Sequence, residues 1–413
     1  MAGGGRRLTF EDACQFLFVR QAGRIKWSLG PTEALLDALG RPERHYPTIH
    51  VAGTNGKGST CAFLAAALRA AGWRVGLYTS PHLVSPCERI TVDGVPIREE
   101  AFAAWTGQLR AHIERMDASF FEAVTAIAFA DLAARGADIA IVEVGLGGRL
   151  DATNVITPLV SVVTKIALEH TDYLGSDLKG IAREKAGIAK PGIPFVTGEP
   201  DRGIRKELVR EAERRGAAPI TAVDTAKRRP SGTRLGLRGA HQRANAALAD
   251  ATLRRLPPPF VVQDDGFPPA FAHAYLPGRF EFRGKWIFDV AHNPDGMAVL
   301  TAAIREYSRE IRRPLHALVG IRNDKDWRTM LDVLAAVVDH LVLTVPPSIP
   351  LMQRWSVDDV GVRASGRPAV HFEPDFERAL QDVQQGAATV LVTGSFHTVG
   401  DALARLPGFA PVG

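Results

Sequence analysis

Cysteine is scarce in this chain of 413 residues, which contains only Cys14, Cys61 and Cys87. An odd number of cysteines without the spacing of metal ligands argues against a disulfide framework and against a cysteine-based zinc site. We therefore expect reduced thiols in buried or partly buried positions.

Long apolar runs are absent as well. No segment reaches the roughly 18–20 apolar residues that a membrane helix needs, and no apolar signal segment follows the N-terminal sequence MAGGGRR. We therefore expect a cytoplasmic protein that makes no use of a membrane.

The sequence also lacks a basic tail, although its formal net charge is +5. The arginines are scattered through segments with a helical pattern and are not interleaved with aromatic residues, so nucleic-acid binding is not favoured. A basic balance suits the binding of small anions equally well.

Short β-branched runs alternate with longer helical patterns, which is typical of parallel α/β sheets. A chain of this length exceeds the size of one hydrophobic core, so two domains are expected. Turn-rich segments at 256–260 and 264–269 separate two such series. The predicted fold is α/β, with a mostly parallel N-terminal domain at 1–276, a smaller C-terminal α/β domain at 277–413 and a hinge near 276–278.

The predicted elements follow from this alternation. The expected strands are 48–52, 74–79, 138–144, 159–164, 193–197, 286–290, 315–320, 341–344 and 389–393. The expected helices are 57–70, 98–115, 120–135, 177–189, 295–307, 326–338, 376–384 and 398–406.

The clearest motif is a glycine-rich loop, GTNGKGS at 53–59, between a predicted strand and a predicted helix. Glycines let backbone N–H groups approach phosphates, and the helix N-terminus adds positive partial charge. Lys57 would neutralise the β and γ phosphates, and the Ser59 hydroxyl would bind magnesium. The motif predicts a P-loop nucleotide site without identifying the reaction.

Polar side chains at the ends of neighbouring strands are candidates for a metal site, because open α/β sheets bind ligands at these ends. Glu143 ends an apolar strand, where a carboxylate needs either a metal ion or a salt-bridge partner. Ser80 follows another strand, and His170 is either a metal ligand or an ordinary loop histidine. Lys185 is either a solvated helix lysine or, if its amine is carbamoylated, an anionic ligand.

Several further motifs occur in order along the chain. They are AGTNGKGS at 52–59, SPHL at 80–83, ERI at 88–90, FFE at 120–122, EVGLGGRLDATN at 143–154, EKAGI at 184–188, LPGR at 276–279, DVAHNP at 289–294 and GSFH at 394–397. With these motifs, which span about 24–406, the chain resembles the folylpolyglutamate synthase branch of the Mur ligase superfamily. The resemblance implies a P-loop domain followed by a Mur-ligase-type C-terminal domain, with ATP between them.

The resemblance also implies roles for individual residues. The catalytic set is Lys57, Glu143, His170 and Lys185. The ligands of two magnesium ions are Ser59, Ser80, Glu143, His170 and carbamoylated Lys185. The ATP-binding residues are Gly56, Lys57, Gly58, Ser59, Asn245, Arg279, Asp289 and His292, with Asn293 in the same motif.

The pterin side of the family's pocket corresponds to a further set. Its members are Lys26, Trp27, Ser28, Leu29, His82, Ser119, Phe120, Phe121, Glu122, Leu150, Asp151 and Ala152. Two positions depart from the family: the run IKWSLG at 25–30 replaces an Ile-Asp-Leu-Gly-Leu type of segment, and Glu169 replaces the usual Asp before the histidine.

The activity that the resemblance implies is the ATP-dependent ligation of L-glutamate to dihydropteroate and to the γ-carboxylates of reduced folates, through an acyl phosphate. A monomer is expected at the level of the family. The runs VGIRNDKD at 319–326 and VTGSFHT at 392–398 favour the bifunctional type. The alternatives are a folylpolyglutamate synthase without dihydropteroate activity, a Mur-type peptidoglycan ligase, and a nucleotide-binding regulatory module without ligase chemistry.

Overall fold

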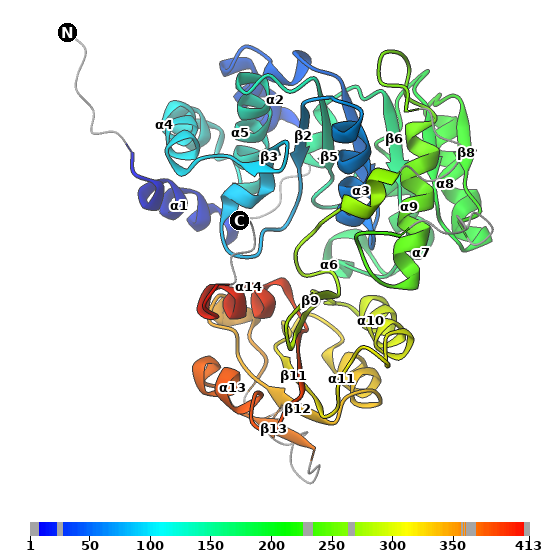
Figure 1. The fold of residues 1–413 in the computed structure, drawn as a ribbon. Coiled ribbons are helices and arrows are strands. Elements are labelled where there is room, and N and C mark those ends of the chain that lie inside the picture. The colour runs from blue at the N-terminus through cyan, green and yellow to red at the C-terminus, as the bar shows by residue number, and fades with distance from the viewer. Residues whose placement is uncertain are drawn as a thin grey trace. The chain divides into compact units, whose positions relative to one another are not determined.

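The computed structural model describes residues 8–22, 28–225, 234–262, 269–356, 358, 360 and 369–408. They form two compact units (Figure 1). The first unit is drawn from Met1–Pro81, Pro86–Arg234 and Ala244–Ala274. The second unit is drawn from His82–Ser85, Leu235–Arg243 and Tyr275–Gly413, so it includes two short segments from earlier in the chain.

The first unit is built on an eight-stranded sheet. In spatial order its strands are β4 (Val95–Pro96), β3 (Ile90–Val92), β2 (Val75–Tyr78), β5 (Ile139–Glu143), β1 (Thr48–Ala52), β6 (Val160–Val163), β7 (Phe195–Thr197) and β8 (Ile220–Ala222). Every pairing is parallel except those of β3 with β2 and with β4. The carboxyl ends of β2, β5, β1 and β6 therefore meet at one edge.

The central strands β1, β5 and β6 are buried along their whole length. Strands covered on both faces carry continuous apolar runs, which is why the sequence predicts them. The predicted strands of this unit are confirmed, with ends that differ by a few residues. The short strands β3, β4 and β8, at or next to the edges of the sheet, were not predicted, because each has only two or three residues and no clear alternation.

Helices cover both faces of this sheet. The helices of the first unit are α1 (Phe10–Phe18), α2 (Gly30–Ala38), α3 (Lys57–Ala70), α4 (Glu99–Met116), α5 (Phe120–Ala134), α6 (Thr171–Leu174), α7 (Leu178–Ala186) and α8 (Arg202–Arg214), and α9 (Ala240–Leu253) contributes residues to both units. One core joins α1, α2, α4 and α5 around Phe102, Ile127 and Phe129. A second core joins α7 and α8 to the sheet around Ile181, Phe195 and Leu208.

The second unit contains a six-stranded sheet. In spatial order its strands are β13 (Val370–Phe372), β12 (His340–Leu343), β11 (Leu315–Val319), β14 (Thr389–Thr393), β10 (Trp286–Phe288) and β9 (Glu281–Arg283). Only β9 pairs in the antiparallel sense. The fold class is therefore confirmed: two sheets, both mainly parallel, each with helices.

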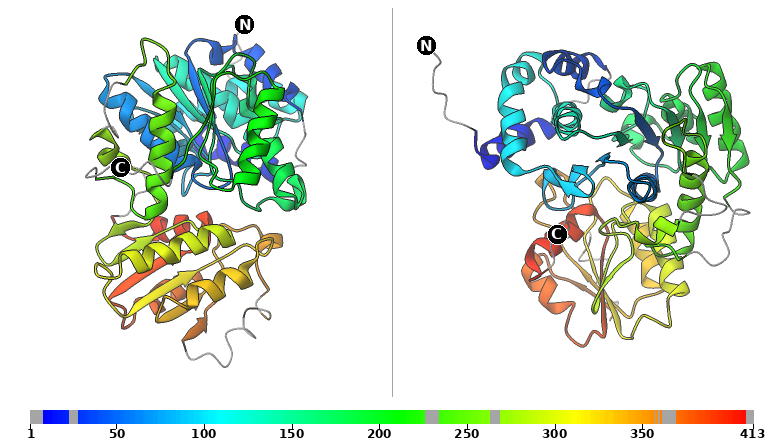
Figure 2. Two further views of the ribbon diagram at one scale, coloured as in Figure 1. Left: turned by 90° about the vertical axis from the view of Figure 1, so that its right-hand side faces the viewer. Right: turned by 45° about the horizontal axis from the view of Figure 1, so that its top comes forward.

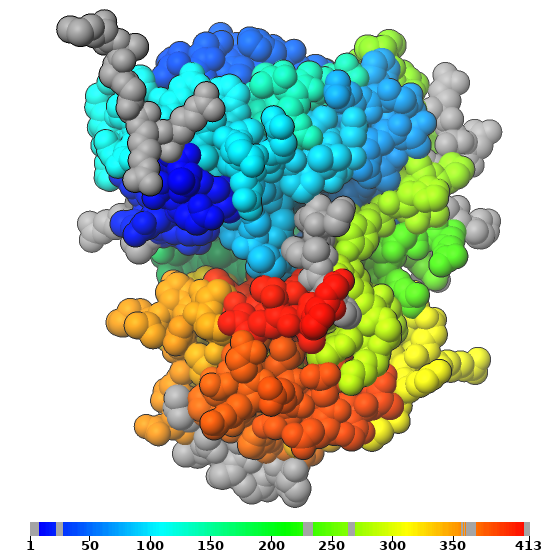
Figure 3. Space-filling model, turned by 60° about the vertical axis from the view of Figure 1, so that its left-hand side comes forward, coloured from blue at the N-terminus to red at the C-terminus, as the bar shows by residue number. Residues whose placement is uncertain are grey.

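The sheet of the second unit lies between two helical layers (Figure 2). Its helices are α10 (Pro294–Glu306), α11 (Trp327–Ala335), α13 (Phe376–Asp382) and α14 (Phe396–Arg405). One core contains Met297 of α10 and Met330 of α11. The opposite core contains Leu380 of α13 and Leu403 of α14, and these two helices lie side by side on the surface (Figure 3).

Short 3-10 turns complete the chain. They are Val19–Ala22, Pro42–Arg44, Pro86–Arg89, Ala152–Val155, Pro269–His273 and Leu351–Gln353. The three cysteines are free thiols, as predicted. Among the described residues, no helix combines the length and the apolar character that crossing a membrane requires.

A close contact in the second unit predicts the effect of two alanine substitutions. A Cβ on Gly400 of α14 would lie 2.0 Å from the carbonyl oxygen of Leu83, whereas a Cβ on Gly107 of α4 would have no neighbour nearer than 3.9 Å. Overpacking costs about 1–3 kcal/mol, so Gly400→Ala should lower the melting temperature in calorimetry. Gly107→Ala should leave it unchanged or raise it, because alanine is favoured over glycine in a helix by about 1 kcal/mol. Equal melting of the two variants would contradict the packing described here.

Candidate active site

The phosphate loop joins β1 to α3 at the carboxyl edge of the first sheet. Gly53 and Gly56 have φ values of 141° and 94°, which residues other than glycine rarely adopt. A Cβ on Gly56 would lie only 2.4 Å from the Oδ1 atom of Asn245, so the Asn245 side chain packs against the loop. Gly56 is the N-cap of α3 and supplies no capping side chain, so the first N–H groups of the helix suit an anion.

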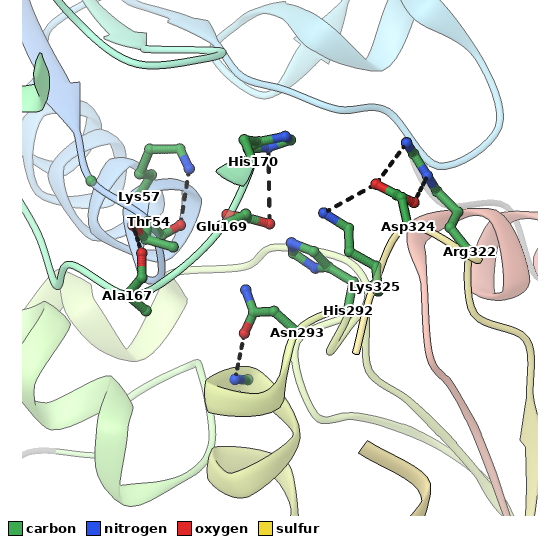
Figure 4. Close-up of polar contacts among 12 residues, drawn as sticks. Thr54, Lys57, Ala167, Glu169, His170, His292, Asn293, Arg322, Asp324 and Lys325 are labelled. Atoms are coloured by element: carbon green, nitrogen blue, oxygen red, sulfur yellow. Dashed lines mark hydrogen bonds and ion pairs between the residues drawn. The ribbon is translucent and has the colours of Figure 1, made fainter. Parts of the chain in front are cut away.

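Hydrogen bonds fasten this loop to the segment that follows β6. The Thr54 N–H donates to the carbonyl of Lys165 at 2.8 Å, and the Thr54 hydroxyl donates to the carbonyl of Ala167 at 3.1 Å (Figure 4). The Thr164 hydroxyl donates to the carbonyl of Asn55 at 2.9 Å. The conformation of the loop is therefore fixed by its contacts with this segment.

Lys57, Glu143 and Ser80 meet at the ends of three neighbouring strands. The Lys57 ammonium lies 3.9 Å from Oε1 of Glu143 and donates to the carbonyl of Thr54 at 3.1 Å. The Ser80 N–H donates to Oε2 of Glu143 at 3.3 Å. Because Glu143 is only 4% exposed, its charge needs this compensation. The salt-bridge partner anticipated for Glu143 is Lys57, the same lysine that would face the phosphates.

Lys185 lies beneath the phosphate loop and is 5% exposed, which excludes a solvated helix lysine. Its ammonium donates to the carbonyl of Gly53 at 2.9 Å. Burial, and after it the charge of Lys57, lowers the Lys185 pKa to about 7, against the opposing charges of Glu169, Asp151 and Glu184. A lysine with this pKa is substantially neutral at pH 7–8, the form that reacts with carbon dioxide.

His170 follows β6 and begins the single turn of α6 with a positive φ of 53°. Its Nε2 atom lies 3.9 Å from Oε1 of Glu169 (Figure 4). Glu169 also acts on the pKa of Lys185, so its carboxylate belongs to the surroundings of the buried lysine. Ser59 is buried in the first turn of α3. The approach of Ser59 and His170 to Glu143 stays a prediction.

This donor set fits a divalent cation beside a nucleotide. Serine hydroxyls and the Glu143 carboxylate are the hard oxygen ligands that magnesium prefers, and the histidine nitrogen also suits manganese. Burial of Glu143 next to a lysine marks a position where positive charge is favoured. The residues present therefore agree with the metal that the sequence implies.

The aromatic residues predicted for the acceptor pocket lie at the start of α5. Ser119 and Glu122 form a capping box: the Ser119 N–H and hydroxyl both donate to Oε2 of Glu122 at 2.7 Å. Glu122 thus holds the helix terminus that presents Phe120 and Phe121. The Arg89 guanidinium lies 5.2 Å from the centre of the Phe120 ring. In the sequence, Arg89 belongs to the motif ERI at 88–90, which by itself predicts no role for it.

Arg89 is buried, and this desolvation lowers its pKa. Phe18 stacks on Phe120 with ring centres 5.4 Å apart, and Phe121 stacks on Tyr78 at 6.1 Å. Neither Phe18 nor Tyr78 was predicted, because nothing in the sequence shows that α1 and β2 lie beside this helix.

Asp151 shapes the loop that follows β5. Its Oδ2 atom accepts from the N–H groups of Gly145 and Leu146 at 3.1 and 2.8 Å, and its Oδ1 atom accepts from the N–H of Thr153 at 2.9 Å. Burial raises the Asp151 pKa. Asp151 therefore fixes the backbone of this loop, which carries Leu150 and Ala152.

The other predicted pterin residues are spread out. The Ser28 hydroxyl accepts from the Gly30 N–H at 3.1 Å, next to Leu29 at the start of α2. Lys26 and Trp27 lie outside the described residues. His82 belongs to the second unit, whereas Ser119–Glu122 belong to the first.

In the second unit, Asp289 and its neighbours follow β10. Asp289 accepts from the N–H groups of Phe280 and Ala291, both at 2.9 Å. Burial raises the Asp289 pKa to about 6, and the charge of Arg279 opposes the shift. The Nδ1 atom of His292 lies 2.8 Å from the carbonyl oxygen of Val290.

Asn293 caps α10 through a 2.7 Å bond from the N–H of Gly296 (Figure 4). As the N-cap of α10, Asn293 has a structural role that is independent of any further contact it makes.

A charged loop after β11 lies at the same edge of the second sheet. Arg322 binds Asp324 with two hydrogen bonds of 2.8 and 3.1 Å, and the Lys325 ammonium lies 3.8 Å from Asp324 (Figure 4). Sequence reasoning used this run only to choose between enzyme types and did not name these residues as a site. Their spacing in the sequence shows no alternation or motif that predicts the arrangement.

Comparison with known proteins agrees with this geometry. The chain matches the Mur ligase middle domain over residues 51–194 and the Mur ligase, glutamate ligase domain over residues 278–396. Fold and matched domains together define an enzyme, an acid–amino-acid ligase of the Mur superfamily.

Similar proteins of known name place the chain in one family within this class of ligases. The dihydrofolate synthase/folylpolyglutamate synthase of Bacillus subtilis is 31% identical over 96% of this chain and 99% of its own length. The folylpolyglutamate synthase of Lacticaseibacillus casei is 34% identical over 88% of this chain and 90% of its own. The chain therefore belongs to the dihydrofolate synthase/folylpolyglutamate synthase family.

Solved structures of relatives have the same fold. The E. coli protein FolC in complex with DHPP and ADP has a TM-score of 0.83 and 32% identity, covering 96% of this chain and 97% of its own. A bifunctional folylpolyglutamate synthase/dihydrofolate synthase with Mn, AMPPNP and L-glutamate bound has a TM-score of 0.83 and 31% identity, covering 97% of this chain and 99% of its own.

The buried amine of Lys185 leads to a prediction about carbon dioxide. Because its pKa is about 7, we expect carbamoylation at pH 8 and much less at pH 6, where the amine is protonated. Carbon-13 NMR in labelled bicarbonate should show a carbamate signal that Lys185→Ala removes. Activity should fall by about 10–100-fold in this variant, as is typical for groups that support metal sites.

The exposed lysine of the same helix provides the control. Lys179→Ala removes the same charge from the surface of α7 and should keep both the signal and the activity. A fully active Lys185→Ala enzyme would show that the lysine has only a packing role.

Proposed function

We propose that this enzyme joins L-glutamate to dihydropteroate and to the γ-carboxylates of reduced folates, at the expense of ATP. The observation that carries the proposal is the meeting of Lys57, Ser80 and Glu143 beneath a P-loop, in a chain that also has a glutamate ligase domain. The relatives bound to DHPP and to L-glutamate support the two substrates.

A carboxylate is a poor acyl donor, so amide formation requires activation. In the proposed reaction an oxygen of the acceptor carboxylate attacks the γ-phosphorus of ATP, and ADP leaves. The acyl phosphate is then attacked by the amine of glutamate, and phosphate leaves. Phosphoryl transfer depends mainly on positioning and on neutralising charge, which fits Lys57 and the N–H groups at the start of α3.

We further propose that two magnesium ions serve this site, held by Ser59, Ser80, Glu143, His170 and carbamoylated Lys185. Bound magnesium would neutralise the phosphate oxygens and orient them. From the second unit, Arg279, Asp289 and His292 would contact the nucleotide. The domain limits 1–276 and 277–413, with a hinge near 276–278, complete the proposal.

The aromatic rings at the start of α5 support a flat bicyclic substrate. Phe120 and Phe121 are presented by a fixed helix terminus, and Arg89 lies against the Phe120 ring. Rings of this kind stack on planar heterocycles. A folylpolyglutamate synthase that lacks dihydropteroate activity is the second candidate, because the L. casei relative is named only as a folylpolyglutamate synthase.

Loss of the lysine or of the carboxylate should abolish turnover. Lys57→Ala and Glu143→Gln each remove a charge at the phosphates, and such contacts contribute on the order of 10²–10³ in rate. Glutamate-dependent ADP release measures the effect, and circular dichroism checks that both variants stay folded.

Two exposed residues serve as matched controls. Lys179→Ala and Glu213→Gln make the same chemical changes on the surface and should keep wild-type ADP release. If Lys57→Ala or Glu143→Gln also kept it, the assignment of this site would be wrong.

The acceptor range distinguishes the two candidate functions. We expect glutamate-dependent ADP release with dihydropteroate and with tetrahydrofolate, each giving a product that is one glutamate heavier by mass spectrometry. Turnover with tetrahydrofolate alone would identify the enzyme as a folylpolyglutamate synthase only. Activity with a UDP-muramoyl acceptor would instead favour a peptidoglycan ligase.

A further inference from the structure

Three side chains of the second unit form a hydrogen-bonded chain that the nucleotide site does not use. The Ser348 hydroxyl lies 2.9 Å from Nδ1 of His397 and 2.9 Å from Oδ2 of Asp401. The Ser348 N–H donates to the same carboxylate oxygen at 3.0 Å. His397 and Asp401 belong to α14, whereas Ser348 lies in the loop after β12.

These distances determine which nitrogen of His397 carries a proton. An ionised carboxylate only accepts, so the Ser348 hydroxyl donates its single hydrogen to Asp401. The same hydroxyl must then accept from Nδ1–H of His397. In a neutral imidazole the other nitrogen, Nε2, is left with its lone pair. Asp401 and Ser348 together therefore present His397 as a base at Nε2.

Other contacts keep this arrangement in place. Arg354 donates to the carbonyls of Ile349 and Pro347 at 2.9 and 2.8 Å and so fixes the loop that carries Ser348. Beside His397, the ring of Phe396 lies 5.4 Å from the His292 ring and 5.1 Å from the Arg279 guanidinium.

The charges around the imidazole favour its neutral form. Burial, and after it the positive charge of Arg322, lowers the His397 pKa, against the opposing charge of Asp401. Arg322 is itself paired with Asp324 in the loop after β11. The loop that carries Ser348 has no titratable side chain from Thr344 to Pro350. Burial and Arg322 thus favour the unprotonated form of His397.

The proposed reaction needs such a group. Free glutamate carries its amine as an ammonium ion at neutral pH, and an ammonium ion has no lone pair with which to attack an acyl phosphate. Some group must accept a proton before the carbon–nitrogen bond forms. The second unit contains the glutamate ligase domain, which covers His292, Arg322 and Phe396 and ends beside His397.

We propose that His397 is the general base of the ligation step, taking a proton from the ammonium group of the incoming glutamate at Nε2, with Ser348 and Asp401 as positioning residues. This inference rests on the proposed function, because it assumes an acyl phosphate and an amine nucleophile. It concerns only the group on the second unit that accepts the proton.

One ammonium proton passes to Nε2 of His397, and the freed lone pair forms the bond to the acyl carbon. The bond from that carbon to the phosphate oxygen breaks, and its electron pair leaves with the phosphate. The second proton of the nitrogen passes to the departing phosphate, and His397 returns its own proton to water.

Hydroxylamine provides the test, because it is largely unprotonated at neutral pH and attacks an acyl phosphate without a base. In His397→Gln the amide oxygen can still accept a hydrogen bond but cannot take up a proton. We expect ligation to glutamate to fall by about 10²–10⁴, the usual contribution of a general base, with the loss in kcat and little change in the KM for glutamate. Hydroxamate formation from the same acceptor and ATP should remain at the wild-type level.

The pH dependence gives a second readout. In the wild-type enzyme, the ratio of glutamate ligation to hydroxamate formation should fall as the pH drops through the His397 pKa, because the protonated ring cannot act as a base. His397→Gln should lack this fall. Ser348→Ala should shift its midpoint, because the tautomer is no longer held, and Ser348→Thr should restore it. His371→Gln, a half-exposed histidine on β13, should change nothing.

The outcomes separate this inference from the proposed function. Equal losses of hydroxamate and glutamate ligation in His397→Gln, or no loss of either, would overturn the role of His397. A wild-type enzyme that forms no hydroxamate and releases no ADP would instead overturn the proposed function, and the role of His397 with it.

Discussion

The first unit depends on the ion pair between a buried carboxylate and a lysine. Glu143 ends a strand that is buried on both faces, where an uncompensated charge would be costly. Its neighbours in the sheet supply the compensation, because β1 leads to Lys57 and β2 leads to Ser80. The same pairing holds a cation where phosphates are expected. Because burying the Glu143 charge is costly, the structure places the Lys57 charge beside it, and this position determines where the enzyme can bind a charged ligand.

The second unit applies the same principle with different chemistry. Its parallel strands also end at one edge, where the segments that follow β10, β11 and β14 carry Asp289, Arg322 and, in the first turn of α14, His397. Where the first unit gathers the groups that we propose for phosphates and metal, this edge gathers a buried acid, an ion-paired arginine and a histidine that is hydrogen-bonded to Ser348. A ligase of this kind needs both kinds of site, because activation transfers a phosphoryl group and ligation releases protons.

Much of the architecture could be read from the sequence. The apolar strands and the P-loop at 53–59 have signals that depend only on nearby residues, and the structure confirms the elements that these signals predict. Edge strands such as β8 and β13 were missed, since a three-residue strand exists only through its neighbours. The sequence also left open whether Lys185 is solvated. Its burial depends on the phosphate loop that covers it.

The sequence by itself determined the main alternation of strands and helices, the glycines of the phosphate loop and the family, because these are properties of local pattern and of motifs. Only the tertiary structure decided that Lys57 compensates Glu143, that Arg89 lies against Phe120, and that Ser348 fixes the tautomer of His397. The partners in each pair are separated by at least 31 positions along the chain. Contacts of that kind depend on how the strands assemble, which no local pattern records.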